Sequence, residues 1–122
     1  MPDPRYDPRR LGRHGEDLVA RWYESQGYDV VDRNWRCEHG ELDLVLLRGR
    51  QLVVCEVKTR SSLRFGHPAE AVGPDKQRRL RRLVGCWLGE VSRRPEVTGV
   101  DAVRIDVAAV VGGRIEVIEG AC

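Results

Sequence analysis

The chain has 122 residues, 41% of them hydrophobic and 33% charged, which predicts one soluble domain rather than two. Its 21 Lys and Arg residues and 19 Asp and Glu residues leave a formal charge of +2, which excludes both an acidic tail protein and a bulk polycation. The apolar runs are far too short to span a bilayer, and the N-terminus has no apolar signal stretch. We therefore expect a cytoplasmic protein without a membrane partner.

The first part of the chain predicts an arm, a helix and a strand. Residues 1–10 hold three Pro and three Arg with almost nothing apolar, which indicates a mobile arm, and residues 11–122 are expected to form the single domain. Apolar residues at helical spacing, followed by Gly27 as a stop, predict a helix over residues 11–26. Residues 28–36 then have the composition of a strand.

The next two segments predict a β-hairpin. Residues 40–47 and 51–60 are β-rich runs joined by a tight connection. Gly49 and Arg50 fit the two-residue loop of a type II′ turn, which has glycine at its first central position.

This hairpin register brings charged side chains together at the end away from the turn. Counting back along both strands places Asp43 opposite Glu56 and Glu41 opposite Lys58. Because side chains alternate along a strand, all four project from one side. The other side is purely apolar and is predicted to be the buried one. Its residues are Leu42, Leu44, Leu46, Val53, Cys55 and Val57.

The second half of the chain predicts one more helix and two more strands. Residues 61–73 indicate a loop or a short helix, after which Asp75 is expected to cap a helix that runs to about Glu90. Strands follow over residues 102–111 and 114–118. The order α-β-β-β-α-β-β predicts an α/β fold, with a mixed β-sheet flanked by helices.

The clustered carboxylates and their neighbouring ammonium group predict a metal-dependent site. Converging carboxylates repel one another unless a cation lies there, and their hard oxygen atoms suit Mg²⁺ or Mn²⁺. Lys58 is one of only two lysines among 21 basic residues, and a lysine can help to activate a water where an arginine cannot give up a proton. The alternative is a surface ion pair between Glu41 and Lys58 that contributes little. We favour the metal site because GELD, residues 40–43, precedes Glu56-Val57-Lys58 in a compatible register.

Asp43 followed by Glu56-Val57-Lys58 resembles the PD-(D/E)xK motif of nucleases with the restriction-endonuclease-like fold. More narrowly, the chain resembles the bacterial YraN family, which is related to Holliday-junction-resolvase-like and RecB-like nucleases. The resemblance covers residues 11 to about 110, and its specific part is GELD together with EVKTR at this separation. It implies a restriction-endonuclease-like mixed sheet and hydrolysis of DNA by an endonuclease or exonuclease.

The resemblance also assigns roles to individual residues. Asp43 and Glu56 would bind the metal, with the backbone carbonyl of Val57 as a third ligand, and Lys58 would be the catalytic lysine. Glu16 matches the first-helix glutamate that related nucleases direct at the metal, often through water. The alternative for Glu16 is a solvated charge on the helix surface.

Three further residues leave alternatives open. Gln77 matches a glutamine that follows the catalytic lysine in RecB-like relatives, or it is an ordinary helix-surface residue. For Glu41 there are three alternatives: it contacts the metal, it pairs with Lys58, or it faces solvent. Asp106 shares a strand face with Arg104 and is predicted to form a structural pair with it rather than to bind metal.

Basic residues gather after the candidate site. Residues 58–82 hold eight basic and two acidic residues, a local charge of +6 in a chain whose total is +2. A basic helix beside a carboxylate cluster predicts a surface that grips the DNA backbone, so binding is expected to be structure-selective or non-specific. A solvated helix face is the alternative. The candidate DNA contacts are Arg60, Arg64, Lys76, Arg78, Arg79, Arg81 and Arg82.

Two functions are consistent with these features. The first is a Mg²⁺- or Mn²⁺-dependent nuclease that acts on DNA, with branched or damaged structures among its candidate substrates. The second is a non-catalytic nucleic-acid-binding or partner-binding module on the same fold. The oligomeric state is left open, and a homodimer is one alternative because resolvase-like relatives often form dimers. The four widely spaced cysteines predict reduced thiols, with Cys55 facing the core, and His39 is expected to lie in a loop.

Overall fold

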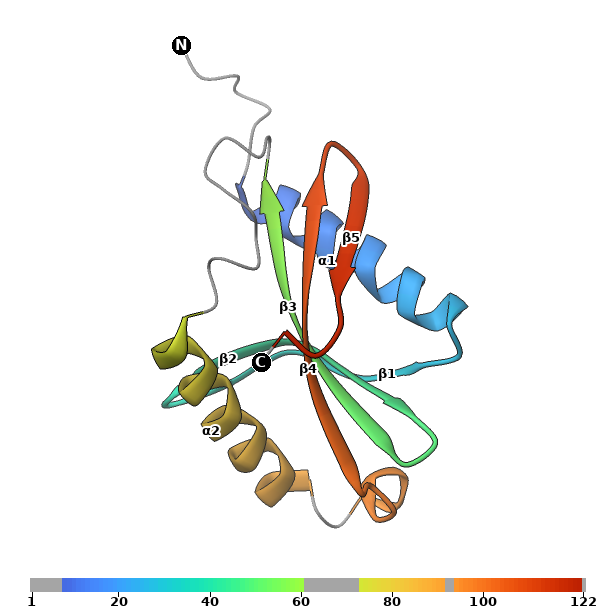
Figure 1. Cartoon of the computed structure of the whole chain (residues 1–122), viewed down its shortest axis with the longest axis vertical. Helices are drawn as coiled ribbons and strands as arrows, with labels where there is room; N and C mark the ends of the chain where they lie inside the picture. Colours follow the sequence, from blue (N-terminus) through green and yellow to red (C-terminus); the bar gives the residue numbers. More distant parts are fainter. Residues whose placement is uncertain (1–7, 61–72, 92–93, 122) are drawn as a thin grey trace.

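The computed structural model describes residues 8–60, 73–91 and 94–121 (Figure 1). Its helices are α1 (Pro8–Ser25), α2 (Pro74–Val91) and the short 3₁₀ helix η3 (Pro95–Val97). Its strands are β1 (Asp29–Cys37), β2 (Gly40–Arg48), β3 (Gln51–Arg60), β4 (Ala102–Val111) and β5 (Arg114–Ile118). The predicted order α-β-β-β-α-β-β is confirmed, as is an α/β fold with a mixed sheet flanked by helices. No helix in the described part has the length and apolarity needed to cross a membrane.

Both long helices begin earlier than predicted. Helix α1 starts at Pro8, inside the segment expected to be an arm, whereas residues 1–7 lie outside the described part. Helix α2 starts at Pro74, whose fixed φ suits the first helical position, so Asp75 lies within the first turn instead of capping it. The loop or short helix expected over residues 61–73 lies, apart from Gly73, outside the described residues.

The sheet has the strand order β1-β2-β3-β4-β5. Strands β3 and β4 are parallel, paired from Gln51↔Ala102 to Arg60↔Val111, and α2 lies in the connection between them. The other neighbouring pairs are antiparallel. Gly49, in the turn between β2 and β3, has a φ of 60°, which matches the predicted type II′ loop.

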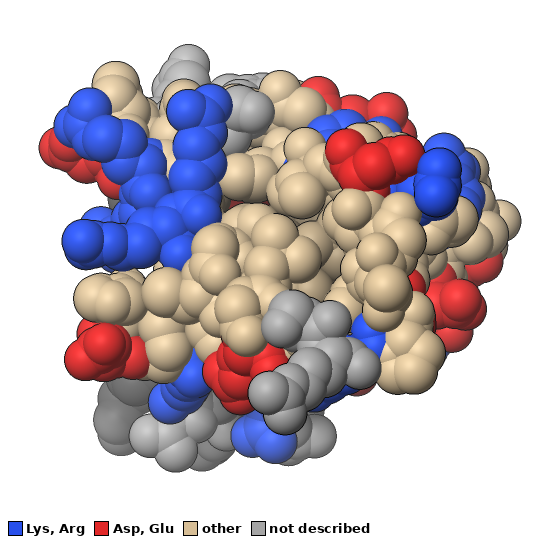
Figure 2. Space-filling model, turned by 90° about the horizontal axis from the view of Figure 1, so that it is seen from below, with Lys and Arg blue, Asp and Glu red and all other residues tan. Residues whose placement is uncertain are grey.

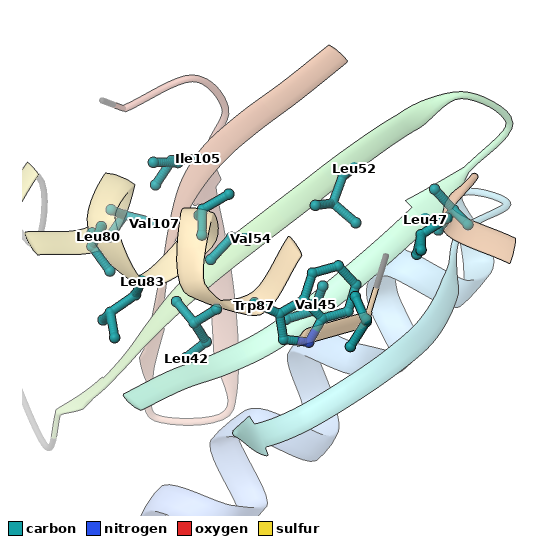
Figure 3. Close-up of a cluster of buried hydrophobic side chains, with 13 residues drawn as sticks. Leu42, Val45, Leu47, Leu52, Val54, Leu80, Leu83, Trp87, Ile105 and Val107 are labelled. Atoms are coloured by element: carbon teal, nitrogen blue, oxygen red, sulfur yellow. The ribbon is translucent and has the colours of Figure 1, made fainter. Parts of the chain in front are cut away.

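Each face of the sheet is covered by one helix (Figure 1). Figure 3 shows the core under α2, in which side chains of the helix face those of the strands. This core includes Leu42, Val45, Leu47, Leu52, Val54, Leu80, Leu83, Trp87, Ile105 and Val107. The core under α1 includes Val19, Tyr23, Leu44, Leu46, Val53 and Cys55.

The prediction that only one face of the hairpin is buried was therefore wrong. The face that carries the charged residues at its end also carries Val45 and Val54, which are buried beneath Trp87 of α2. Its polar character is confined to the end of the hairpin away from the turn. Trp87 is fully buried, and its Nε1 donates to Asp32 Oδ2 of β1 at 3.0 Å.

Leu42 was expected to share a face with Leu44 but packs in the α2 core, whereas Leu44 packs in the α1 core. The alternation of β2 changes between them, at Asp43. The neighbouring strand is irregular at the same place, because Asn34 of β1 has a φ of 49° in the left-handed region that asparagine tolerates. Asp43 thus lies between a residue of the α2 core and a residue of the α1 core.

Gly15→Ala is expected to lower the free energy of unfolding by about 1–3 kcal/mol through overpacking, even though alanine is the better helix former. Gly15 of α1 lies against Thr59 of β3, and a Cβ on Gly15 would overlap Thr59 Oγ1. Chemical denaturation measures the loss, and adding Thr59→Ala should recover most of it. A Gly15→Ala protein as stable as the wild type would contradict this close approach.

Candidate active site

The candidate site lies where β2 and β3 stop pairing. Their ladder follows the predicted register from Arg48↔Gln51 and ends at Leu44↔Cys55. Beyond that point the carboxylate of Asp43 acts as the acceptor for the β3 backbone, because the N–H of Val57 donates to Asp43 Oδ2 at 2.9 Å. The side chain of Asp43 is thereby fixed beside the segment that carries the other candidate ligand.

Glu56 is held by two lysines from different elements. Lys58 Nζ of β3 lies 3.2 Å from Glu56 Oε1, and Lys76 Nζ of α2 lies 3.1 Å from the same oxygen. The Glu56 side chain is only 13% exposed, so both ion pairs are partly shielded from water. Both lysines of an arginine-rich chain therefore meet at one carboxylate.

The role of Lys76 is the main feature that the sequence interpretation missed. Lys76 was predicted to contact DNA from the basic helix, but the structure places its ammonium group in the carboxylate cluster. A signal was present, since Lys58 and Lys76 are the only lysines among 21 basic residues. The contact with Glu56 could not be predicted from it, because the hydrophobic periodicity of the sequence does not show how α2 packs against β3.

Asp43 is electrostatically unusual. Burial, followed by the nearby charge of Glu56, raises its pKa to about 7, although the hydrogen bond from Val57 acts in the opposite direction. Near neutral pH, a large fraction of the Asp43 carboxyl groups is therefore protonated. A cation that stabilises the carboxylate would lower this pKa again.

The raised pKa of Asp43 makes the free energy of unfolding depend on pH, and the direction of the shift fixes the sign of this dependence. The unfolded state releases the Asp43 proton near pH 4, whereas the folded state keeps it until about pH 7. The stability that Asp43 contributes is therefore complete below pH 4 and is lost as the pH rises toward 7. Without divalent cations, Asp43→Asn should gain stability relative to wild type by an amount on the order of 4 kcal/mol between these pH values. Denaturation at a series of pH values measures the gain, and a pH-independent difference would contradict it.

Glu16 of α1 approaches the same end of the sheet from the other face. Its charge contributes to the raised pKa of Asp43, and its own pKa is raised by burial, against the effect of a hydrogen bond with Asn34. Glu16 Oε2 is buried and is one of two buried side-chain oxygens in the described part of the chain without a hydrogen-bond partner. A buried acceptor of this kind favours the predicted approach to a cation over the solvated alternative.

Glu41 lines the carboxylate cavity, whereas Gln77 is not among its lining residues. Glu41 Oε2 pairs with Arg36 Nε of β1 at 3.3 Å, while Lys58 is engaged by Glu56. Gln77 is half-buried in the first turn of α2, and its backbone N–H donates to the carbonyl of Gly73 at 3.0 Å.

Two depressions meet beside α2. The carboxylate cavity has a volume of about 220 Å³ and is lined by Gly40, Glu41, Asp43, Glu56, Lys76, Arg79, Leu80 and Leu83. The basic groove is larger, about 790 Å³, and is lined by His39, Asp75, Arg78, Arg79, Arg81 and Arg82. Arg79 borders both depressions, so the basic groove lies next to the carboxylate cavity. In Figure 2, Lys and Arg side chains gather along the edge of the molecule where α2 lies in Figure 1.

His39 lies between two strands, and Arg60 lies at the end of a third. His39 lies in the turn between β1 and β2, as expected, and also lines the basic groove. Arg60 ends β3, but its side chain lies outside the described part, as does the whole of Arg64.

Asp106 is separate from the carboxylate cluster and forms the predicted pair with Arg104. It is completely buried and accepts from Arg104 Nε at 2.8 Å and from Arg104 Nη2 at 2.9 Å. Tyr23 Oη donates to it at 2.6 Å, and the N–H of Gly120 donates at 2.9 Å. Its oxygens are thus occupied by a structural network.

The donor set at the sheet end fits a hard divalent cation. Mg²⁺ is commonly bound through one or two carboxylates with water completing its shell, and Asp43 and Glu56 supply two. The buried oxygen of Glu16 lacks a partner, and the mutual repulsion of Asp43 and Glu56 would be relieved by a cation. Among the described residues, no group of three or more His, Cys, Asp or Glu side chains is already arranged as a metal cage, so water or substrate oxygens would complete the coordination.

Comparison with known proteins places the chain in a family. Residues 15–110 match the model of "Uncharacterised protein family UPF0102". A UPF0102 protein of Pseudarthrobacter chlorophenolicus is 51% identical over 89% of this chain and 80% of its own length. A UPF0102 protein of Beutenbergia cavernae is 47% identical over 90% and 93%, and one of Acidothermus cellulolyticus is 46% identical over 91% and 92%. The chain therefore belongs to UPF0102, the YraN family that its GELD and EVKTR segments resemble.

Proposed function

We propose that this protein is a cytoplasmic, Mg²⁺- or Mn²⁺-dependent nuclease that hydrolyses phosphodiester bonds in DNA. The observation that carries the proposal is the cluster of Asp43, Glu56 and Lys58, two of which line the carboxylate cavity next to the basic groove. Paired carboxylates and a lysine beside a phosphate-binding surface are the groups that metal-assisted phosphodiester hydrolysis requires.

Each residue of the cluster has a distinct part in this chemistry. Asp43 and Glu56 would hold the cation, with the carbonyl of Val57 and the oxygen of Glu16 nearby. The bound cation would polarise the phosphate and lower the pKa of a water molecule. Burial, followed by the proximity of Lys76, lowers the pKa of Lys58, which makes it easier for Lys58 to exchange a proton with the attacking water.

The basic groove supports binding of the DNA backbone. Its arginines lie on the exposed side of α2, and contacts from arginine to phosphate carry no sequence information. The substrate is therefore expected to be selected by its structure or not at all, with branched or damaged DNA among the candidates.

The double variant Arg81→Gln/Arg82→Gln should weaken DNA binding and flatten its salt dependence. Each lost phosphate contact reduces the slope of log K against log salt by about 0.9, so the pair should reduce it by about 1.8. Fluorescence anisotropy across a salt series measures the slope. The matched control is Arg94→Gln plus Arg114→Gln, which removes the same charge at exposed positions that do not line the groove. Equal slopes for the two double variants would exclude the groove as the DNA surface.

The test of the function is cleavage by the purified protein. Linear duplex, single-stranded and branched DNA are incubated with Mg²⁺ or Mn²⁺ over a wide concentration range, with Asp43→Asn as the inactive control. Metal-dependent cutting that disappears in Asp43→Asn supports a nuclease. Tight DNA binding by both proteins without cutting of any substrate would support the non-catalytic binding module instead.

A further inference from the structure

The shared oxygen of Glu56 is the starting point. Lys58 reaches Glu56 Oε1 from two residues along the same strand, so its position is set by β3 itself. Lys76, which lines the carboxylate cavity, reaches the same oxygen from α2. One carboxylate is thus bound by two ammonium groups, one local to the strand and one delivered by the basic helix.

An ammonium group and a divalent cation compete for such an oxygen. Both are attracted by the same carboxylate, and their like charges repel one another at this range. Glu56 is 13% exposed and Lys76 is 24% exposed, so bulk water screens this competition only in part. The Lys76 ammonium therefore opposes a cation at Glu56.

When DNA is bound, a phosphate group would offer Lys76 a second anionic partner besides Glu56. Its side chain lines the carboxylate cavity together with Arg79, and Arg79 continues into the basic groove. A phosphate brought along the groove would enter the cavity beside Lys76. The charge of that phosphate would attract the ammonium group away from Glu56.

We propose that Lys76 is a positioning residue that exchanges Glu56 for a DNA phosphate, so that DNA binding removes one of the two ammonium groups at Glu56 Oε1 and makes this oxygen more available to the divalent cation. This inference rests on the proposed function, because it concerns the same carboxylates and the same DNA surface. It adds a coupling between the two ligands, in which metal binds more tightly to the DNA complex than to the free protein. By linkage, metal raises the affinity for DNA by the same factor.

The experiment measures Mn²⁺ binding, and its readout is independent of cleavage. Electron paramagnetic resonance counts free Mn²⁺ during titration of wild type and Lys76→Gln, with and without phosphorothioate DNA, which keeps the backbone charge and resists hydrolysis. Without DNA, Lys76→Gln should bind Mn²⁺ at least about fivefold more tightly than wild type. The increase in affinity caused by DNA should be at least about fivefold larger in wild type than in Lys76→Gln.

Two controls isolate the role of Lys76. Lys76→Arg keeps the positive charge and should retain the weak Mn²⁺ binding of the DNA-free wild type. Arg94→Gln removes one exposed charge beyond the other end of α2 and should leave Mn²⁺ binding unchanged. Circular dichroism of each variant confirms that the compared proteins are folded.

The outcomes separate this inference from the proposed function. If wild type cuts no DNA but shows the coupling that depends on Lys76, the inference stands and the nuclease proposal fails. If wild type cuts DNA while Lys76→Gln binds Mn²⁺ no more tightly than wild type, the inference alone is overturned. Absence of Mn²⁺ binding by both proteins would overturn the inference together with the metal site.

Discussion

Lys58→Met should lower the turnover of metal-dependent DNA cleavage by about 10²- to 10⁴-fold and leave DNA affinity nearly unchanged. Lys58 lies 3.2 Å from Glu56 Oε1 in the half-buried C-terminal part of β3, and burial, followed by the proximity of Lys76, lowers its pKa. Its proposed work is on the attacking water, so its loss affects the chemical step more than binding. Single-turnover cleavage at saturating protein measures the chemical step, and anisotropy at the same salt concentration measures affinity.

Two comparisons sharpen the test of Lys58. Lys58→Arg keeps the charge but cannot easily give up a proton, so it should restore little of the rate. Arg94→Gln serves as the matched loss of one charge outside the site and should cleave like wild type. A Lys58→Met protein that cleaves at nearly the wild-type rate would remove Lys58 from the mechanism.

Asp106→Ala should lower the free energy of unfolding by about 3–5 kcal/mol, because it removes the buried, closer partner of the partly buried Arg104 charge. Asp106 is completely buried and is bound by Arg104 through two hydrogen bonds and by the hydroxyl of Tyr23. Removing the carboxylate leaves the Tyr23 hydroxyl and the Gly120 N–H without this acceptor, and Arg104 keeps only the Tyr28 hydroxyl at 3.3 Å and Glu119 at 3.7 Å. Urea denaturation followed by circular dichroism measures the loss.

Smaller changes to the same network provide the control. Tyr23→Phe removes one donor and leaves the Arg104–Asp106 pair, so it should cost about 1 kcal/mol. Because Asp106 is not in the carboxylate cluster, Asp106→Ala under conditions where it is folded should bind Mn²⁺ as wild type does. Loss of Mn²⁺ binding by folded Asp106→Ala would show that Asp106 belongs to the metal site after all.

The features that could be predicted are those set by local sequence. The turn at Gly49 determines the hairpin register, and that register is observed from Arg48↔Gln51 to Leu44↔Cys55. From the register alone, Asp43 and Glu56 were expected near one another, and the charge of Glu56 does contribute to the raised pKa of Asp43. The Arg104–Asp106 pair is equally local, because two residues on one strand share a face.

The features that could not be predicted depend on how distant elements pack. The second buried face of the hairpin exists because α2 returns over it, and alternation within two strands gives no sign of that helix. The change of side at Asp43 accompanies the left-handed backbone of Asn34 on a different strand. Lys76 lies on α2, in the connection between β3 and β4, and meets Glu56 only when this helix packs on the sheet, so its place in the site is a tertiary property.

The parallel ladder of β3 and β4 has a consequence for the order in which the chain folds. Its paired residues are 51 positions apart, as in Gln51↔Ala102, whereas β2 and β3 are joined by a two-residue turn. The entropy lost on closing a loop grows with loop length, so the hairpin is the less costly contact to form first. Asp43, Glu56 and Lys58 are therefore brought together by rapid local pairing. Lys76 and the basic groove arrive with the slower long-range closure that completes the sheet.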